Sequence, residues 1–542
     1  MPAVVTDQFR ITNASNFVDS VLDSNNSYYV FLGLPNPAGD NPGVSAAGFG
    51  RTDGWNSSAG TPNPVDNLQY LTHYRDTSLF GKKINSSNIR RVVKKHTWSA
   101  NTRYDMYRHD YEALSNPAPK SQTGSLYKTN FYVLTSEFKV YVCLDNGSSG
   151  SNIKGNVSLD EPTFTDLEPA SAGTQNDGYI WKYLFTVSPS DVIKFDSTEF
   201  IVLPNDWSTT TDAQIQAVRE AGDADINKNQ LKKVYIKNAG SGYANGIYSC
   251  EILGDGTGGQ ATVTVSGQSI TEVIVTAGGF GYTFGMVDLS SISLSATGTR
   301  AHLIPIIPPS KGHGFDIYTE LGADKVLVYS RFDDSTKDFP TDTHFGQVGI
   351  IKNPSQFNTA AGILTTSQFS SLSSIKLQSG INQPGTGGYD SLIGVGITQS
   401  VTGGVARGIV ASYDPDTFVL KYIQDRSLNL RKLNLSDDTS GSDSIDYAGV
   451  DQRAKVLSFE STTQPINGKG LNATFDVSID QNFSGITTTI GNKQINLGVD
   501  FTNGLANPEI NKKTGDVIYI DNRKEVERNS RQKEDVKIIL EF

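Results

Sequence analysis

The apolar residues of this chain stand in short runs, and this feature limits the fold more than any other. Gly, Ser, Thr, Asn and Asp separate the runs, and glycine alone occurs 52 times in 542 residues. Strands need only about five or six residues, whereas a helical bundle needs longer periodic stretches. We therefore predict a mainly β protein of the α+β class. At roughly 150 residues per domain it is multidomain, with antiparallel, sandwich-like or barrel-like domains and a few short helices.

One predicted strand is unusually aromatic. Asp177–Phe185 holds four aromatic residues in nine positions, in a chain that is 10% aromatic overall. The stretch contains no nucleophile, no set of metal ligands and no phosphate-binding loop. We interpret it as a large apolar strand surface, of the kind that builds a core or docks on a partner rather than one that catalyses.

Two helices are predicted from local patterns. Apolar residues over Phe17–Leu22 recur with helical spacing after possible caps at Asn13 and Ser15, and Thr211 with Gln214 fits a capping box for the second helix. Turn-rich loops are predicted at residues 35–65 and 437–446. Strands are predicted at Tyr28–Leu34, within Phe131–Leu144 (with Phe138, Val140, Val142 and Leu144 on one face), and at Tyr179–Val187, Glu199–Leu203, Val405–Tyr413, Thr417–Ile423 and Val517–Ile520.

The C-terminus predicts a long-range contact. Val536, Ile538, Leu540 and Phe542 alternate with other residues, so the chain ends inside a sheet. A terminal strand of this kind pairs with strands that are distant in sequence. We therefore expect the N-terminal and C-terminal segments to share one domain.

Residues 231–289 contain an internal repeat. Val234–Tyr243 matches Val273–Tyr282, an offset of 39 residues (273 minus 234). Each copy has a short apolar strand, a glycine turn and a tyrosine positioned to cover the turn. Two copies are fewer than the roughly three that a solenoid needs, so we predict a small β module.

Charge and cysteine content exclude several classes of protein. The net charge of −11 repels nucleic acid on average. No apolar run approaches the roughly 18 residues of a membrane span, and Met1–Arg10 lacks the pattern of a signal peptide. Cys143 and Cys250 are too few for a disulfide framework, so we interpret them as reduced thiols of a protein made in a cytosol.

Residues 81–111 form a basic exception within the acidic chain. They hold eight Lys or Arg residues against two Asp, with Trp98, Tyr104 and Tyr107 among them. Basic and aromatic residues together fit a protein interface, since Arg, Tyr and Trp anchor such surfaces. A binding site for single-stranded nucleic acid and a solvated face with a few structural arginines are the alternatives.

Motifs for small ligands are weak. Gly254, Gly256 and Gly259 form a GxGxxG, but a strand rather than a helix is predicted after it, so we interpret it as a glycine turn. Residues 223–229 alternate oxygen-bearing side chains like a calcium loop, but lack its glycine and its bidentate glutamate; a solvated turn is the preferred interpretation. Gly312–Gly314 is interpreted as a tight turn. We predict no catalytic, cofactor or metal site.

Five phrases, in the same order, resemble the baseplate wedge subunit of the gene-product-eight type from T-even-like contractile-tailed phages. The phrases are Arg90-Arg91 with Trp98 and Thr102–Tyr104, then Val140–Asp145, Asp177–Phe185, Phe345–Pro354 and Gly515–Arg523. The resemblance implies a wedge-subunit core over residues 1–225, to which 300–354 and 508–542 return. Residues 230–300 and 355–507 then look like insertions, the first being the Gly/Tyr repeat module and the second a β-rich domain.

The resemblance implies a structural subunit without enzymatic activity. It would form a homodimer, contact other baseplate wedge proteins, and lie in the tail baseplate of the virion. From the acidic charge and the lack of a long apolar run, we expect it to bind neither nucleic acid nor membrane. Combining it with the basic stretch, we predict as interface or scaffold residues Arg90, Arg91, Trp98, Arg103, Tyr104, Tyr107, Trp181 and Tyr183. We also expect joint replacement of Arg90 and Arg91 by Ala to leave the fold intact and to weaken assembly.

A second class of function stays open. Gly/Tyr-rich modules and Ser/Thr-rich β segments also occur in tail proteins that bind or cleave host-surface glycans. The two insertions would be the parts that contact glycan.

Overall fold

The computed structural model describes most of the chain, and the loops predicted at residues 35–65 and 437–446 lie outside the described part. The described residues are 4–33, 78–112, 121, 124–333, 344–357, 362–382, 388–392, 395–401, 404–423, 456–459, 475–483, 489–490, 493–494, 499–502, 504–511, 514–528 and 532–542.

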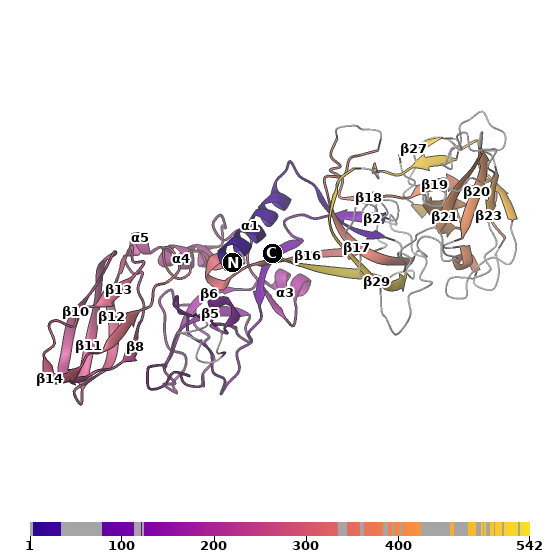
Figure 1. Ribbon diagram of the computed structural model, residues 1–542. Coiled ribbons are helices and arrows are strands. Elements are labelled where there is room, and N and C mark those ends of the chain that lie inside the picture. The colour runs from indigo at the N-terminus through magenta and orange to yellow at the C-terminus, as the bar shows by residue number, and fades with distance from the viewer. Residues whose placement is uncertain are drawn as a thin grey trace. The chain divides into compact units, whose positions relative to one another are not determined.

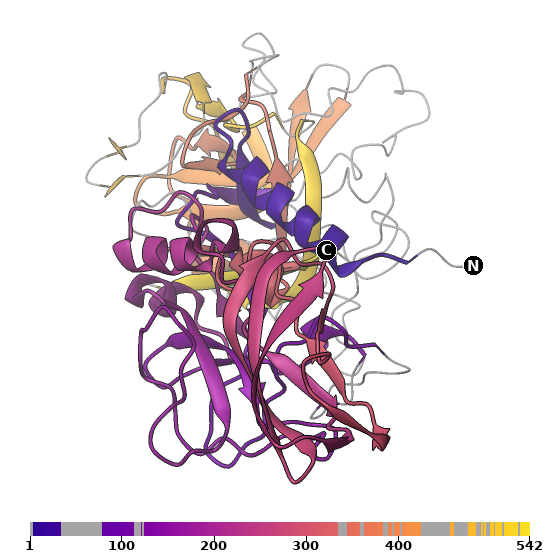
Figure 2. The same ribbon diagram turned by 90° about the vertical axis from the view of Figure 1, so that its left-hand side faces the viewer.

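The chain divides into two compact units, which are described separately. The first comprises Met1–Val18, Ile89–Leu327 and Ile538–Phe542, and the second Asp19–Asn88 and Val328–Lys537. Both terminal segments belong to the first unit, as predicted from the C-terminal alternation. The rings of Phe17 and Phe542 are 5.6 Å apart, and Figures 1 and 2 both place the C-terminus beside α1. The three-part domain division inferred from the resemblance stays a prediction.

Helices are short, and both predicted helix starts need correction. Helix α1 spans Asp7–Leu22, so Asn13 and Ser15 lie inside it and cap nothing. Helix α4 begins one residue later than the capping box predicts, because Asp212 rather than Thr211 accepts the free backbone N–H groups. The other described helices are η1 (Leu126–Lys128), α3 (Pro189–Phe195), α4 (Ala213–Gly222), α5 (Ala224–Asn227), α6 (Ile317–Leu321) and η2 (Gly388–Leu392).

An aromatic three-stranded sheet forms part of the first unit. Its antiparallel order is β4-β5-β6, with β4 at Tyr132–Leu134, β5 at Lys139–Asn146 and β6 at Tyr179–Thr186. Both faces of β5 and β6 are buried. Phe138, which the pattern placed on the apolar face of β5, instead lies in the β4–β5 turn with φ 58° and is 41% exposed.

A second sheet has the order β30-β16-β3-β7, with β3, β7, the start of β16 and the end of β30 in the first unit. Its strands are β3 (Ile89–Lys94), β7 (Phe200–Val202), β16 (Lys325–Phe332) and β30 (Glu534–Glu541). The chain passes from one unit to the other within β16 and β30. The C-terminus therefore ends in a sheet, as the alternation predicted.

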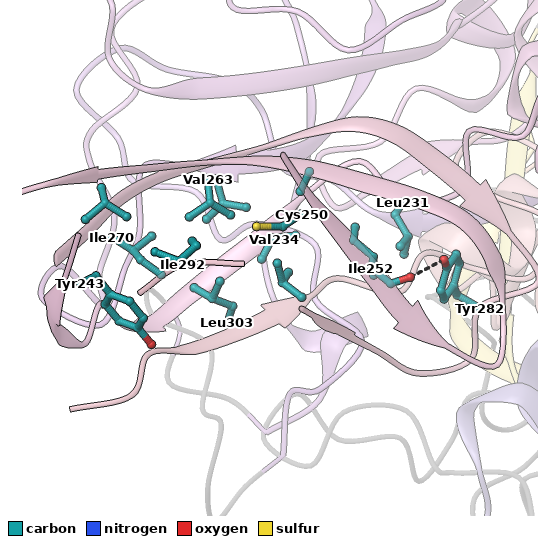
Figure 3. Packing of buried hydrophobic residues seen from close by; sticks show 14 of the residues in the cluster. Leu231, Val234, Tyr243, Cys250, Ile252, Val263, Ile270, Tyr282, Ile292 and Leu303 are labelled. Carbon is teal, nitrogen blue, oxygen red and sulfur yellow. Dashed lines mark hydrogen bonds between the residues drawn. The ribbon is translucent and has the colours of Figure 1, made fainter. Parts of the chain in front are cut away.

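The predicted Gly/Tyr module is a β-sandwich within the first unit (Figure 1). One sheet has the order β12-β11-β10-β13, and the pairs β15-β8 and β14-β9 complete the module. Figure 3 shows the apolar core between these strands. The strands are β8 (Val234–Asn238), β9 (Ser241–Tyr243), β10 (Gly246–Gly254), β11 (Thr257–Ser266), β12 (Ser269–Phe280), β13 (Gly285–Val287), β14 (Leu294–Thr299) and β15 (His302–Pro305).

Both copies of the repeat have the predicted turn and tyrosine cover. Gly240 and Gly279 adopt φ 68° and 59° at equivalent positions, which only glycine adopts without strain. Tyr243 and Tyr282 are buried. The Tyr282 hydroxyl donates to the carbonyl of Ile252 at 2.7 Å (Figure 3). The module is thus built from two related corners.

The second unit contains two larger sheets. The first has the order β18-β2-β1-β17-β29, and the second has the order β24-β23-β20-β21-β22-β19-β28-β27. The predicted hairpin around residues 414–416 is present as β21 and β22. The strands are β1 (Tyr28–Gly33), β2 (Ser78–Lys83), β17 (His344–Lys352), β18 (Gln368–Ser370), β19 (Ser373–Lys376), β20 (Gly396–Val401), β21 (Gly404–Asp414), β22 (Val419–Ile423), β23 (Val456–Phe459), β24 (Phe475–Ser478), β25 (Thr489–Ile490), β26 (Lys493–Gln494), β27 (Val499–Thr502), β28 (Leu505–Asn507) and β29 (Asp516–Glu527).

The fold is therefore mainly β and multidomain, with antiparallel sheets and few short helices, as predicted. Among the described residues, every helix is too short or too polar to cross a membrane.

Candidate protein-interaction site

The aromatic residues predicted as anchors meet on strand β6. Trp181 is fully buried and stacks on Tyr179, with ring centroids 5.3 Å apart. The rings of Tyr104 and Trp181 pack in a T-shaped arrangement, with their centroids 5.8 Å apart. The Tyr179 hydroxyl accepts a hydrogen bond from the backbone N–H of Tyr104 at 2.9 Å. Tyr104 thus fixes the loop after β3 to the aromatic sheet.

Trp98 and Arg103 lie in the same loop as Tyr104, but they bind the segment 155–158 rather than strand β6. The indole Nε1 of Trp98 donates to the hydroxyl of Ser158 at 3.1 Å, and Nε of Arg103 donates to the carbonyl of Gly155 at 3.3 Å. Trp98 is half-buried and Arg103 is exposed. Of the eight predicted residues, Arg103 is therefore the one whose charge is open to solvent.

Arg90 lies on β3 and contacts helix α3. It forms an ion pair with Asp191 at 2.8 Å, and its guanidinium lies 5.2 Å from the Phe195 ring centroid. This contact ties β3 to α3 inside the first unit.

Arg91, the next residue on β3, is only 3% exposed. Its guanidinium lies 4.3 Å from the ring centroid of Tyr318 on α6, and Nε donates to the hydroxyl of Ser15 at 3.4 Å. Burial raises the pKa of the Tyr318 hydroxyl to about 12, although Arg91 opposes this shift. Because a buried cation–π contact stabilises by about 2 kcal/mol, we now expect replacement of Arg91 by Ala to destabilise the fold rather than to leave it intact.

Tyr107 packs against a buried polar pair. Its ring packs edge to face with the His313 imidazole, and the two ring centroids are 4.7 Å apart. His313 Nδ1 lies 2.7 Å from a Glu320 carboxylate oxygen, and the other oxygen of Glu320 accepts the backbone N–H of Gly314 at 2.7 Å. Burial, and then the nearby Glu320, hold the pKa of the Tyr107 hydroxyl well above its usual range. The predicted tight turn at Gly312–Gly314 is confirmed, since the N–H of Gly312 donates to the carbonyl of Pro309. The His313 imidazole and the Gly314 N–H of this turn both contact the Glu320 carboxylate.

Tyr183 stands apart from Tyr104 and Trp181. Its ring packs edge-on against Tyr141 of β5 at 5.6 Å, and its hydroxyl is 2.8 Å from that of Thr186. Lys182, next to it on β6, is 2% exposed and donates from Nζ to the carbonyl of Leu167 at 2.8 Å. Burial lowers the pKa of the Lys182 ammonium to about 8.

Arg108 was not among the predicted anchors, yet it joins the Gly/Tyr module to the aromatic sheet. Its guanidinium lies 4.2 Å from the ring centroid of Tyr235 on β8 and binds both carboxylate oxygens of Asp110, at 2.7 and 2.6 Å. A second link is the ion pair between Lys233 and Asp145. The sequence could have indicated Arg108, because it belongs to the basic stretch. Its partner Tyr235 could be found only from the tertiary structure.

The weak ligand motifs have structural roles. Gly254 ends β10 and Gly259 lies within β11, so a strand stands where a dinucleotide site requires a helix N-terminus. The predicted glycine turn is the short link at Gly256 between the two strands. Tyr282 covers Gly256 and Gly259, because an added Cβ would lie 2.4 Å from its ring at Gly256 and 2.7 Å from its hydroxyl oxygen at Gly259. Asp223 caps the short helix α5 rather than starting an open calcium loop.

Both cysteines are buried free thiols, as predicted. Burial raises the pKa of Cys143 well above its usual range, and it raises the pKa of Cys250. A raised pKa keeps a thiol protonated and unreactive. Within the described residues, no three His, Cys, Asp or Glu side chains are grouped as metal ligands.

Comparison with known proteins finds a similarity to a phage baseplate protein. The chain is 25% identical over 227 residues to the baseplate wedge protein gp8 of Enterobacteria phage T4, a match that covers 37% of this chain. The matched part spans 60% of the length of that protein. No protein-family model matches the chain. The similarity supports, at a coarse level, the relationship to baseplate wedge proteins that the five sequence phrases indicated.

Proposed function

We propose that this protein is a structural component of the baseplate of a contractile phage tail and acts through protein–protein interfaces. The observation that carries the proposal is the similarity to a protein named as a baseplate wedge protein. The mainly β, multidomain fold is consistent with it. On this proposal the chain resides in the virion, contacts other baseplate wedge proteins and forms a homodimer.

The contacts within the first unit suit a part that moves as one body. Arg90, Arg91 and Arg108 bind aromatic rings or carboxylates of distant segments. Packed elements of this kind shift as units when an assembly rearranges. We therefore propose that the aromatic sheet and the Gly/Tyr module transmit displacement together when a baseplate changes state.

Light scattering after size exclusion tests the dimer. One chain has a mass of 58.6 kDa, so we expect a species at twice that mass. A stable trimer would contradict the wedge-type assembly and would favour a fibre or glycan-binding tail protein.

Variants at Arg103 test the role in assembly. Arg103→Ala removes an exposed charge, so we expect stability to change by less than about 0.5 kcal/mol and recovery of wedge complexes, by affinity purification with the other baseplate chains, to fall. Arg300→Ala, at another exposed cation of the same unit, is the matched control. Equal recovery of complexes with wild type and Arg103→Ala would remove Arg103 from the interface.

A further inference from the structure

A groove of about 730 Å³ lies in the first unit, at one end of the sheet β30-β16-β3-β7. All four strands contribute: Glu541 ends β30, Lys325 begins β16, Lys94 ends β3 and Phe200 begins β7. Helix α1 and helix η1 supply further walls. Its volume falls within the roughly 300–1,000 Å³ of ligand clefts.

Three cations in the groove lack partners. Arg10 of α1, Lys94 of β3 and Lys128 of η1 line it, and within the part of the chain that the structure describes their side chains form no ion pair or hydrogen bond. Lys325 differs from them, since it pairs with Asp324 at 2.9 Å and with Glu541 at 3.1 Å. Among the described residues the groove therefore holds three cations without a close carboxylate, and its five basic and four acidic residues leave a net charge of +1 (5 minus 4).

The other groove residues indicate what kind of anion fits. Aromatic surface comes from the half-buried rings of Tyr127 and Phe200, and the nearly buried Ile11 and Leu321 lie behind it. The carboxylates of Glu199 and Asp7 line the same groove. A nucleic acid duplex carries one charge per roughly 1.7 Å, and such dense charge would be repelled by these carboxylates. A peptide with separated carboxylates meets the cations, and its uncharged residues cover the apolar wall.

We propose that this groove binds an extended peptide segment in which Asp or Glu side chains are separated by uncharged residues. The occupant is a segment of a neighbouring tail protein, and this identity rests on the proposed function. The chemistry of recognition rests only on the groove. Arg10, Lys94 and Lys128 pair with the carboxylates, and exposed pairs of this kind steer association and lose strength in salt.

The test uses the full chain and a fluorescent decapeptide in which Glu alternates with Ser and Tyr. Its control peptide has Gln at each Glu position. Anisotropy titrations at low salt compare wild type with the triple variant Arg10→Ser, Lys94→Ser and Lys128→Ser. The matched control protein carries Lys154→Ser, Lys237→Ser and Arg300→Ser, which remove the same charges from exposed positions of the same unit.

We expect the Glu peptide to bind wild type and the control protein within twofold of each other, and the groove variant at least tenfold more weakly. Binding of the Gln peptide should be at least tenfold weaker than that of the Glu peptide. Equal loss in both triple variants, equal binding of the two peptides, or tighter binding of an oligothymidylate that displaces the peptide would each overturn the proposal. None of these results bears on whether the chain enters a wedge complex, which the co-purification measures separately.

Discussion

Strand β6 of the aromatic sheet and strand β11 of the Gly/Tyr module differ in how many of their faces are buried. In β6, Trp181, Lys182, Tyr183, Leu184 and Phe185 are all buried, so both faces are covered. In β11, buried residues from Gly259 to Val265 alternate with exposed or half-buried polar ones, so one face meets solvent. A strand covered on both faces must place even its charged side chain inside the protein, whereas a half-covered strand can direct polar groups outward.

The difference teaches where stability is concentrated. In β6 it comes from large buried rings, against the cost of one desolvated ammonium. In the module it comes from an aliphatic core closed by two tyrosine-covered glycine turns. Substitutions in each strand separate the two cases, because amide hydrogen exchange measures the free energy with which that strand opens.

Trp181→Ala should give the largest loss. The substitution removes a fully buried indole that stacks on Tyr179 and meets Tyr104, so we expect opening of β6 to become about 3–5 kcal/mol easier. Trp181→Phe keeps a ring and removes an indole N–H that has no hydrogen-bond partner among the described residues, so it should lose less. As the comparison in the module, Ile274→Ala at 52% exposure should change stability by less than about 0.5 kcal/mol. Equal effects at Trp181 and Ile274 would contradict the contrast.

Lys182 should make the stability of β6 depend on pH. Burial lowers the pKa of its ammonium to about 8 from the ordinary 10.5, so the unfolded state binds the proton more tightly than the folded state. Stability is therefore lowest below pH 8 and rises as the pH increases towards 10.5, by about 2–3 kcal/mol.

The variant Lys182→Met should lose this rise. Exchange measured between pH 8 and 10 on both proteins isolates the lysine, because the buried tyrosines contribute equally to each. A parallel pH dependence in the variant would show that another group is responsible.

Gly279→Ala and Gly267→Ala form a matched pair in the module. Both residues have positive φ, 59° and 60°, so both substitutions incur the roughly 1–2 kcal/mol cost of a left-handed conformation. A Cβ at residue 279 would lie 2.4 Å from the carbonyl oxygen of Thr257, whereas one at 267 meets nothing within 4 Å. We expect Gly279→Ala to cost at least about 1 kcal/mol more in β11 and β12. Equal costs would mean that the close approach adds nothing.

Tyr282→Phe and Tyr243→Phe should give the smallest and most specific difference. The Tyr282 hydroxyl donates to Ile252 and accepts from the N–H of Gly259 at 3.0 Å, both within the core. The Tyr243 hydroxyl accepts one part-buried bond, from Ala301 at 2.9 Å. We expect Tyr282→Phe to lower the free energy of unfolding by about 1–3 kcal/mol and Tyr243→Phe to lower it by about 0.5–1.5 kcal/mol. A larger loss at Tyr243 would reverse the order of the two corners.

Local patterns in the sequence were sufficient for most strands, because a short apolar run between turn residues needs no distant information. The hairpin β21–β22 and the two corners of the module belong to this group. The patterns misplaced residues where neighbours compete for one role: Thr211 and Asp212 both suit a cap, and Phe138 continued the alternation of β5 although the chain turns there.

The sequence by itself determined that this protein is a mainly β chain with aromatic strands, a tyrosine-covered repeat and a basic stretch. Only the tertiary structure decided what that stretch does within the chain. Arg91 meets Tyr318, and Arg108 meets Tyr235, across more than a hundred residues of sequence in each case. Lys94 is only three residues from Arg91, yet at the groove its side chain has no ion-pair or hydrogen-bond partner among the described residues. Charge and aromaticity are properties of single residues, but the partner of a side chain depends on which distant segments the fold brings within a few ångströms of it.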